Sequence, residues 1–183
     1  MSGTTRASVL LSGGIDSAAC AHLLLRKQIE VNAIFFDYGQ AAALREQFAA
    51  RSIANHLGVD FQTIQLKTPT SFGPGELVGR NAFFIFAALL ATGGVHGLIS
   101  LGLHSGTPYY DCSTDFVREM NQLLAHHTDG KTAVFAPFLD WTKKDVYDYF
   151  LQSTVPLELT YSCEAGTMPV CGKCASCRDR GSL

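Results

Sequence analysis

The hexapeptide Ser12-Gly13-Gly14-Ile15-Asp16-Ser17 lies between a short apolar run, residues 8–11, and a stretch rich in Ala and Leu, residues 16–27. This order is typical of a strand, a glycine turn and a helix. The first turn of a helix offers unpaired backbone N–H groups and the positive end of the helix dipole, which together favour an anion. Glycines let the backbone approach phosphate oxygens, because no Cβ stands in the way. The hexapeptide therefore predicts a phosphate-binding loop.

The side chains of this loop indicate which phosphate chemistry it suits. Ser12 and Ser17 supply hydroxyl donors, and Asp16 is a candidate magnesium ligand, because this cation takes oxygen ligands beside phosphates. The Lys that a Walker A loop requires is missing, which disfavours ordinary transfer of a γ-phosphoryl group and favours pyrophosphate. The alternative interpretation is an ordinary strand-to-helix turn in which Ser or Asp caps the helix.

Strands and helices are expected to alternate along the rest of the chain. The expected strands are residues 31–36, 61–66, 98–101 and 133–136, and the expected helices are residues 41–57, 80–92, 113–127 and 143–152. Gly58 should end one helix, and Thr142 should cap another with Asp145 in the capping-box position. Residues 67–79 hold several Pro and Gly and are expected to form a loop.

This alternation implies right-handed crossovers and a mostly parallel sheet with helices on both faces. We therefore expect an α/β fold with three layers and a doubly wound sheet. Ligands of such sheets bind at the carboxyl ends of the strands. The loops after Leu11, Phe36, Leu101 and Ala136 should converge on one site.

Length and composition suit one globular domain over residues 1–183, with 47% hydrophobic and 16% charged residues. The formal net charge of −2 supplies no basic field, which disfavours nucleic acid as a partner. The longest apolar stretch, residues 82–91, is about half as long as a membrane-crossing helix. Since no signal peptide is visible either, we expect a cytoplasmic protein with no membrane association.

Four of the six cysteines crowd into the C-terminal region, at Cys163, Cys171, Cys174 and Cys177. The two-residue gaps let neighbouring thiolates reach one metal, and four thiolates form a closed tetrahedral zinc site of the structural kind. We expect a small zinc knuckle over residues 160–180. An iron–sulfur cluster and a disulfide pair are the alternatives.

The hexapeptide resembles the signature of the N-type ATP pyrophosphatases, also called the PP-loop superfamily, whose fold is adenine nucleotide alpha hydrolase-like. Together with the C-terminal cysteines, it resembles the 7-cyano-7-deazaguanine synthase (QueC-like) family. Further matches in the family's order are residues 36–40, 79–81, 110–112, 115–116, 137–138 and 142–143, followed by Arg180 near the C-terminus. The resemblance covers essentially the whole chain.

The resemblance implies that a deazapurine acid, 7-carboxy-7-deazaguanine, is converted with ATP and ammonia into 7-cyano-7-deazaguanine, releasing AMP and pyrophosphate. ATP would come with Mg²⁺, and Asp16 and Lys143 would be the catalytic residues. The implied ATP-binding residues are Leu10, Leu11, Ser12, Gly13, Gly14, Asp16, Ser17, Phe36, Asp37, Tyr38, Gly39 and Lys143. The implied substrate-binding residues are Arg80, Asn81, Tyr109, Tyr110 and Asp111.

These residue types suit those roles. The Lys143 ammonium is a point charge for phosphates, and the Arg80 guanidinium is a bidentate fork for phosphate or carboxylate. Asp111 would accept two hydrogen bonds from the guanine-like edge of the base, and Tyr109 or Tyr110 would stack on its face. His104, at a strand end, is interpreted as a structural or rim residue.

The chain also departs from the family pattern and is therefore expected to be a short, divergent member. Ala41 and Ala42 follow Gln40 where the family carries Arg-His, a family Asp is replaced within residues 103–106, and residues 67–78 form a shorter segment. One alternative is a relative that stops at the amide or joins the acid to another amine, on a protein or a small molecule. A non-catalytic nucleotide sensor, a zinc-ribbon adaptor and a tRNA sulfur-transfer enzyme are further alternatives. A protein partner and a homodimer are left open.

Overall fold

Five parallel strands form the centre of the protein in a computed structural model that describes residues 5–67, 72, 75, 77–94 and 97–183. The strands are β1 (Arg6–Leu10), β2 (Glu30–Asp37), β3 (Asp60–Gln65), β4 (Gly97–Ser100) and β5 (Thr132–Phe135). Their spatial order is β3-β2-β1-β4-β5, and every neighbouring pair is parallel. The strand order reverses between β1 and β4, which is where ligands bind in open α/β sheets.

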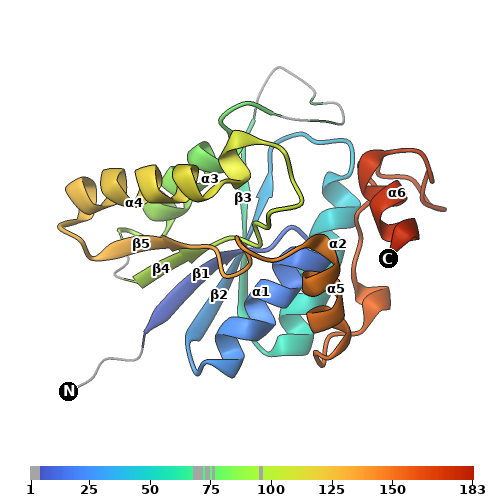
Figure 1. Cartoon of the computed structure of the whole chain (residues 1–183), viewed down its shortest axis with the longest axis horizontal. Helices are drawn as coiled ribbons and strands as arrows, with labels where there is room; N and C mark the ends of the chain where they lie inside the picture. Colours follow the sequence, from blue (N-terminus) through green and yellow to red (C-terminus); the bar gives the residue numbers. More distant parts are fainter. Residues whose placement is uncertain (1–4, 68–71, 73–74, 76, 95–96) are drawn as a thin grey trace.

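Helices cover both faces of this sheet, as Figure 1 shows. The α-helices are α1 (Ile15–Arg26), α2 (Ala43–Leu57), α3 (Arg80–Ala91), α4 (Thr114–Thr128), α5 (Lys143–Leu151) and α6 (Ala175–Ser182). Helices α1, α2 and α5 lie on one face, α3 and α4 lie on the other, and α6 lies beyond α2 and α5 (Figure 1). This arrangement confirms the expected three-layer, doubly wound α/β fold.

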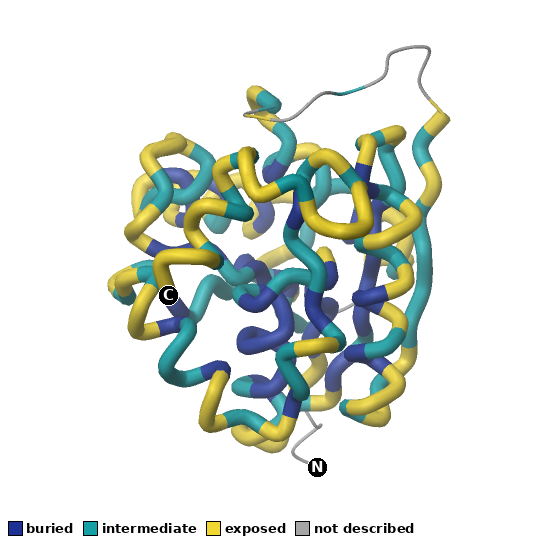
Figure 2. The backbone as a smooth tube through the Cα atoms, turned by 90° about the vertical axis from the view of Figure 1, so that its right-hand side faces the viewer, coloured by how far each residue is buried: buried dark blue, intermediate teal, exposed yellow. Residues whose placement is uncertain are grey.

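Two apolar cores hold the layers together, one on each face of the sheet. Because side chains alternate along a strand, β2 contributes Phe35 to the core under α1, α2 and α5, and it contributes Ile34 and Phe36 to the core under α3 and α4. Both faces of the central strands are therefore buried. Figure 2 shows the buried residues, in dark blue, inside the molecule.

The structure confirms two helix ends that the sequence predicts. Thr142 and Asp145 form a complete capping box at α5, and Gly58 ends α2 in the left-handed conformation with φ of 67°. Helix α2 starts two residues later than expected, at Ala43. The expected loop 67–79 lies largely outside the described residues. Helix α6 and the 3-10 turns Tyr110–Cys112 and Leu157–Leu159 were not predicted.

Among the described residues, no helix is both long enough and apolar enough to span a lipid bilayer.

Candidate functional site

The phosphate-binding loop predicted from the sequence leads from β1 into α1 and is held by its own serines. The Ser17 hydroxyl accepts a hydrogen bond from the Ser12 N–H at 3.2 Å and donates one to the Gly14 carbonyl at 3.1 Å. The two serine hydroxyls lie 3.1 Å apart. No side chain caps the start of α1, so its first turn faces the loop with the polarity that an anion prefers.

Gly13 is the residue that the geometry of this loop requires. Its φ is +88°, and a Cβ at this position would lie 2.6 Å from the backbone oxygen of Glu46 in α2. A side chain there would strain the backbone and push α2 away. The glycine therefore allows the phosphate loop to pack directly against the helix that follows β2.

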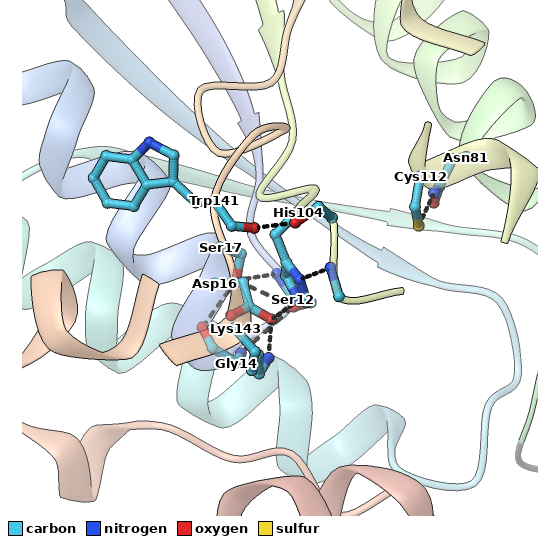
Figure 3. Close-up of polar contacts among 11 residues, drawn as sticks. Ser12, Gly14, Asp16, Ser17, Asn81, His104, Cys112, Trp141 and Lys143 are labelled. Carbon is cyan, nitrogen blue, oxygen red and sulfur yellow. Dashed lines mark hydrogen bonds and ion pairs between the residues drawn. The ribbon is translucent and has the colours of Figure 1, made fainter. Parts of the chain in front are cut away.

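Asp16 is the centre of the polar cluster that Figure 3 shows. Its Oδ2 lies 2.6 Å from Nζ of Lys143, at the start of α5, and 3.8 Å from Nε2 of His104, after β4. Its Oδ1 is buried and has no hydrogen-bond partner among the described residues. A buried carboxylate oxygen without a donor is an available ligand for a hard cation. Loops after β1, β4 and β5 therefore meet here, which are three of the four loops that the sequence predicts to converge.

His104 is buried against Asp16, and its orientation is fixed by the backbone. Its Nδ1 accepts a hydrogen bond from the Gly106 N–H at 3.0 Å, so in the neutral ring Nε2 carries the proton toward Asp16. Burial lowers the pKa of His104. The negative charge of Asp16 raises this pKa, and the positive charge of Lys143 lowers it further. The sequence predicted a structural or rim role for His104, and its position at a strand end was the signal that could have placed it beside Asp16.

The loop after β2 turns at Gly39 and carries the residues predicted to hold adenine. The Asp37 carboxylate accepts hydrogen bonds from the Gly39 N–H at 3.1 Å and from the Gln65 side chain at 3.3 Å. Phe36 stacks on Phe84 of α3 with ring centroids 4.3 Å apart. The hydrogen bonds fix the shape of the loop, and the Phe36–Phe84 pair belongs to the apolar core under α3 and α4.

Glu46 of α2 contacts this loop and lies within electrostatic reach of Arg80 in α3, and it was not singled out from the sequence. It accepts a hydrogen bond from the Gln40 side chain at 3.0 Å. Burial raises the pKa of the Glu46 carboxyl, and the Gln40 hydrogen bond and the Arg80 charge lower it. Burial also raises the pKa of Tyr38, with Arg80 acting in the opposite direction. Arg80 therefore lies near the loop that follows β2.

The other predicted substrate residues form a second group around Asn81, which lies apart from Asp16 in Figure 3. Asp111 accepts a hydrogen bond from the Asn81 N–H at 3.4 Å, and the Asn81 side chain donates to the Asp111 carbonyl at 3.1 Å. Asn81 is buried, so this pair ties the turn before α4 to the start of α3. Tyr109 and Tyr110 are exposed, and the Tyr110 hydroxyl donates to Glu119.

The four C-terminal cysteines converge as their spacing predicts. One sulfur atom from each of Cys163, Cys171, Cys174 and Cys177 lies within 4.8 Å of all the others. Burial raises the pKa of the Cys163 thiol, but hydrogen bonds from the backbone N–H groups of Cys171 and Ala165 outweigh it and lower the value to about 5. A thiolate at neutral pH is the form that binds metals. The cluster fits a metal ion with four sulfur ligands.

Comparisons with known proteins agree with this arrangement. A family model described as queuosine biosynthesis protein QueC matches residues 6–82 and 77–182. The chain is 31% identical to a 7-cyano-7-deazaguanine synthase of Methanothermobacter thermautotrophicus, over 96% of this chain and 92% of the relative.

Two solved structures show the same fold at low sequence identity. One is a predicted subunit of tRNA methyltransferase from Methanocaldococcus jannaschii, with a TM-score of 0.56 and 15% identity over 81% of this chain and 76% of the other. The second is the U34-tRNA thiolase NcsA from Methanococcus maripaludis with its 4Fe–4S cluster. Its TM-score is 0.53, with 15% identity over 88% of this chain and 63% of the other. They support the three-layer α/β fold and carry no argument about activity.

Proposed function

Since the chain belongs to the family of the queuosine biosynthesis protein QueC, we propose that it converts 7-carboxy-7-deazaguanine, ATP and ammonia into 7-cyano-7-deazaguanine. The observation that carries the proposal is the Asp16–Lys143 pair at the start of α1, with a buried carboxylate oxygen left free for a cation. Release of pyrophosphate develops negative charge, which the Lys143 ammonium and a cation held by Asp16 would stabilise beside the phosphate loop.

The reaction proceeds through two adenylations. A carboxylate is a poor electrophile, so its oxygen first attacks the α-phosphorus of ATP and pyrophosphate leaves. Ammonia then attacks the acyl carbon, loses a proton and displaces AMP, which gives the amide. The amide oxygen is adenylated by a second ATP, and loss of AMP and the remaining protons on nitrogen leaves the nitrile. Each round therefore consumes one ATP and releases one AMP and one pyrophosphate.

The protein's part is to hold the triphosphate and to balance its charge. The amides and hydroxyls of residues 12–17 bind the departing pyrophosphate, and Lys143 adds a positive charge beside it. Asp16, whose buried Oδ1 has no hydrogen-bond partner among the described residues, would hold the Mg²⁺ that accompanies ATP, and this ion would supply positive charge beside the phosphates. His104 would limit the movement of Asp16, because its Nε2 lies 3.8 Å from the Asp16 carboxylate. The backbone of Leu10 and Leu11 would lie beside the bound triphosphate.

The base-binding roles follow from where the loops lie. Phe36, Asp37, Tyr38 and Gly39 would hold adenine, because their loop has a fixed shape beside the phosphate loop. Arg80 is proposed to bind the substrate carboxylate.

The roles proposed for the second group depend on local contacts. Asn81 would position the turn that carries Asp111, Tyr109 and Tyr110. Its backbone N–H donates a hydrogen bond to the Asp111 carboxylate, and its side chain donates one to the Asp111 carbonyl. The Asp111 carboxylate and one of the tyrosines would then meet the deazapurine. Zinc in the cysteine cluster, a single domain, a cytoplasmic location and a homodimer remain predictions.

Mass spectrometry of the products tests the proposal. The protein is incubated with 7-carboxy-7-deazaguanine, ATP, Mg²⁺ and ammonium, and AMP, pyrophosphate and product mass are measured together. We expect two AMP and two pyrophosphate for each nitrile. One AMP for each amide, with no nitrile on longer incubation, would instead identify a ligase that stops halfway. AMP formation that does not depend on the acid would contradict the proposal altogether.

A further inference from the structure

The C-terminal segment 160–180, here called the cysteine knuckle, contacts the phosphate loop directly. The Tyr161 N–H donates a hydrogen bond to the Gly13 carbonyl at 2.9 Å. The Tyr161 carbonyl oxygen lies 3.9 Å from the place where a Cβ on Gly14 would be. The segment that leads to Cys163 therefore runs alongside both glycines of the loop.

A second contact joins the cysteine knuckle to the loop after β2. Gly166 has φ of +69°, and a Cβ on it would lie 2.4 Å from the Ala41 backbone oxygen and 3.0 Å from the Ala42 Cα. The Gly166 N–H donates to the Cys163 carbonyl at 3.0 Å, which fixes the turn on that side. Both nucleotide loops, after β1 and after β2, thus pack against the cysteine knuckle.

These contact residues flank a metal-ligating residue. Tyr161 and Gly166 are two residues before and three residues after Cys163, whose side chain is fully buried. Within the cysteine knuckle, the Tyr161 hydroxyl donates to the Thr167 carbonyl at 2.8 Å. A metal that holds Cys163 to the three later cysteines would therefore also fix the backbone that contacts the nucleotide loops.

We propose that the cysteine knuckle positions the nucleotide site through Tyr161 and Gly166, so that metal binding and ATP binding strengthen each other. The inference rests on the proposed use of residues 12–17 for ATP. Coupling between two sites is reciprocal: if the metal raises nucleotide affinity by some factor, nucleotide raises metal affinity by the same factor. We expect a factor of about ten, within the usual range for coupled sites.

The first test separates the contact from metal binding itself. Gly166→Ala is compared with Gly130→Ala, because Gly130 has a matching φ of +70° but no heavy atom within 4 Å of its added Cβ. Metal content is measured by mass spectrometry, and affinity is measured for Mg²⁺ with α,β-methylene-ATP, whose α–β bridge cannot be hydrolysed. We expect Gly166→Ala to weaken nucleotide binding about tenfold and Gly130→Ala to leave it unchanged.

The second test uses the unaltered protein and decides the matter if Gly166→Ala loses its metal or fails to fold. The affinity for Zn²⁺ is measured by competition with a chromophoric chelator, with and without saturating analogue. We expect about tenfold tighter Zn²⁺ binding with the analogue. An unchanged Zn²⁺ affinity, or equal nucleotide affinities in the two variants with metal retained, would overturn this inference and leave the proposed function untouched. If the unaltered protein binds no analogue, the proposed function fails with it.

Discussion

Substituting Gly13 by alanine tests the packing of the phosphate loop. The new Cβ would lie 2.6 Å from the Glu46 backbone oxygen, 3.0 Å from the Ala49 Cβ and 3.1 Å from the Ala50 backbone nitrogen. Unstrained contacts of this kind are ~3.5–4.0 Å long. None of the three atoms belongs to a flexible side-chain end, so either the loop or α2 must move.

Two separate effects set the magnitude. Alanine at φ of +88° is strained by about 1 kcal/mol or somewhat more, as for any residue with a Cβ in the left-handed region. Overpacking against backbone atoms adds about 1–3 kcal/mol. Gly58→Ala supplies the first effect alone, because Gly58 has φ of +67° and no atom within 4 Å of an added Cβ. We therefore expect losses in stability of about 3 kcal/mol for Gly13→Ala and about 1 kcal/mol for Gly58→Ala.

Urea unfolding followed by circular dichroism measures both losses, and binding of α,β-methylene-ATP with Mg²⁺ is measured under native conditions. Gly13→Ala should also weaken nucleotide binding, because moving the loop displaces the donors aimed at the phosphates, whereas Gly58→Ala should not. Equal losses of stability in the two variants would show that Gly13 makes no close contact with α2. The reasoning about this loop would then be refuted.

Three further outcomes are expected. Lys143→Met removes the ammonium group that pairs with Asp16 and should lower AMP release at least about tenfold with the fold retained. Unchanged release would exclude Lys143 from the chemistry. Cys174→Ser should lose bound metal and lower the melting temperature, and full metal content in this variant would contradict the four-cysteine site. Burial and, to a lesser extent, Arg26 lower the pKa of His22, so the unfolded chain takes up a proton first and stability should fall as pH drops below about 6.5. His22→Gln should flatten that slope in urea titrations, and an unaltered slope would show that another group is responsible.

Much of the fold was readable because its signals are local. The strand, glycine turn and helix around residues 12–17, the capping box of Thr142 and Asp145, and the helix end at Gly58 depend on residues a few positions apart. Helix α6 escaped prediction because its eight residues contain none that is buried, so no apolar periodicity marks it.

The candidate site was predicted in part. Spacing alone brought the four cysteines together, and the strand-end rule brought Asp16 and Lys143 to the same edge of the sheet. His104 was interpreted only as a structural or rim residue, although it follows a strand, and Tyr161 was not assigned to the site, since a contact through a backbone N–H leaves no sequence pattern.

The types of the strands and helices, the glycine turn of the phosphate loop and the spacing of the four cysteines follow from the sequence alone, because each arises within a short stretch of chain. The strand order, the contact between Asp16 and Lys143 across 127 residues, and the packing of the cysteine knuckle against Gly13 arise from long-range packing. Those contacts depend on which distant surfaces bury one another, and no local preference of the chain specifies that choice.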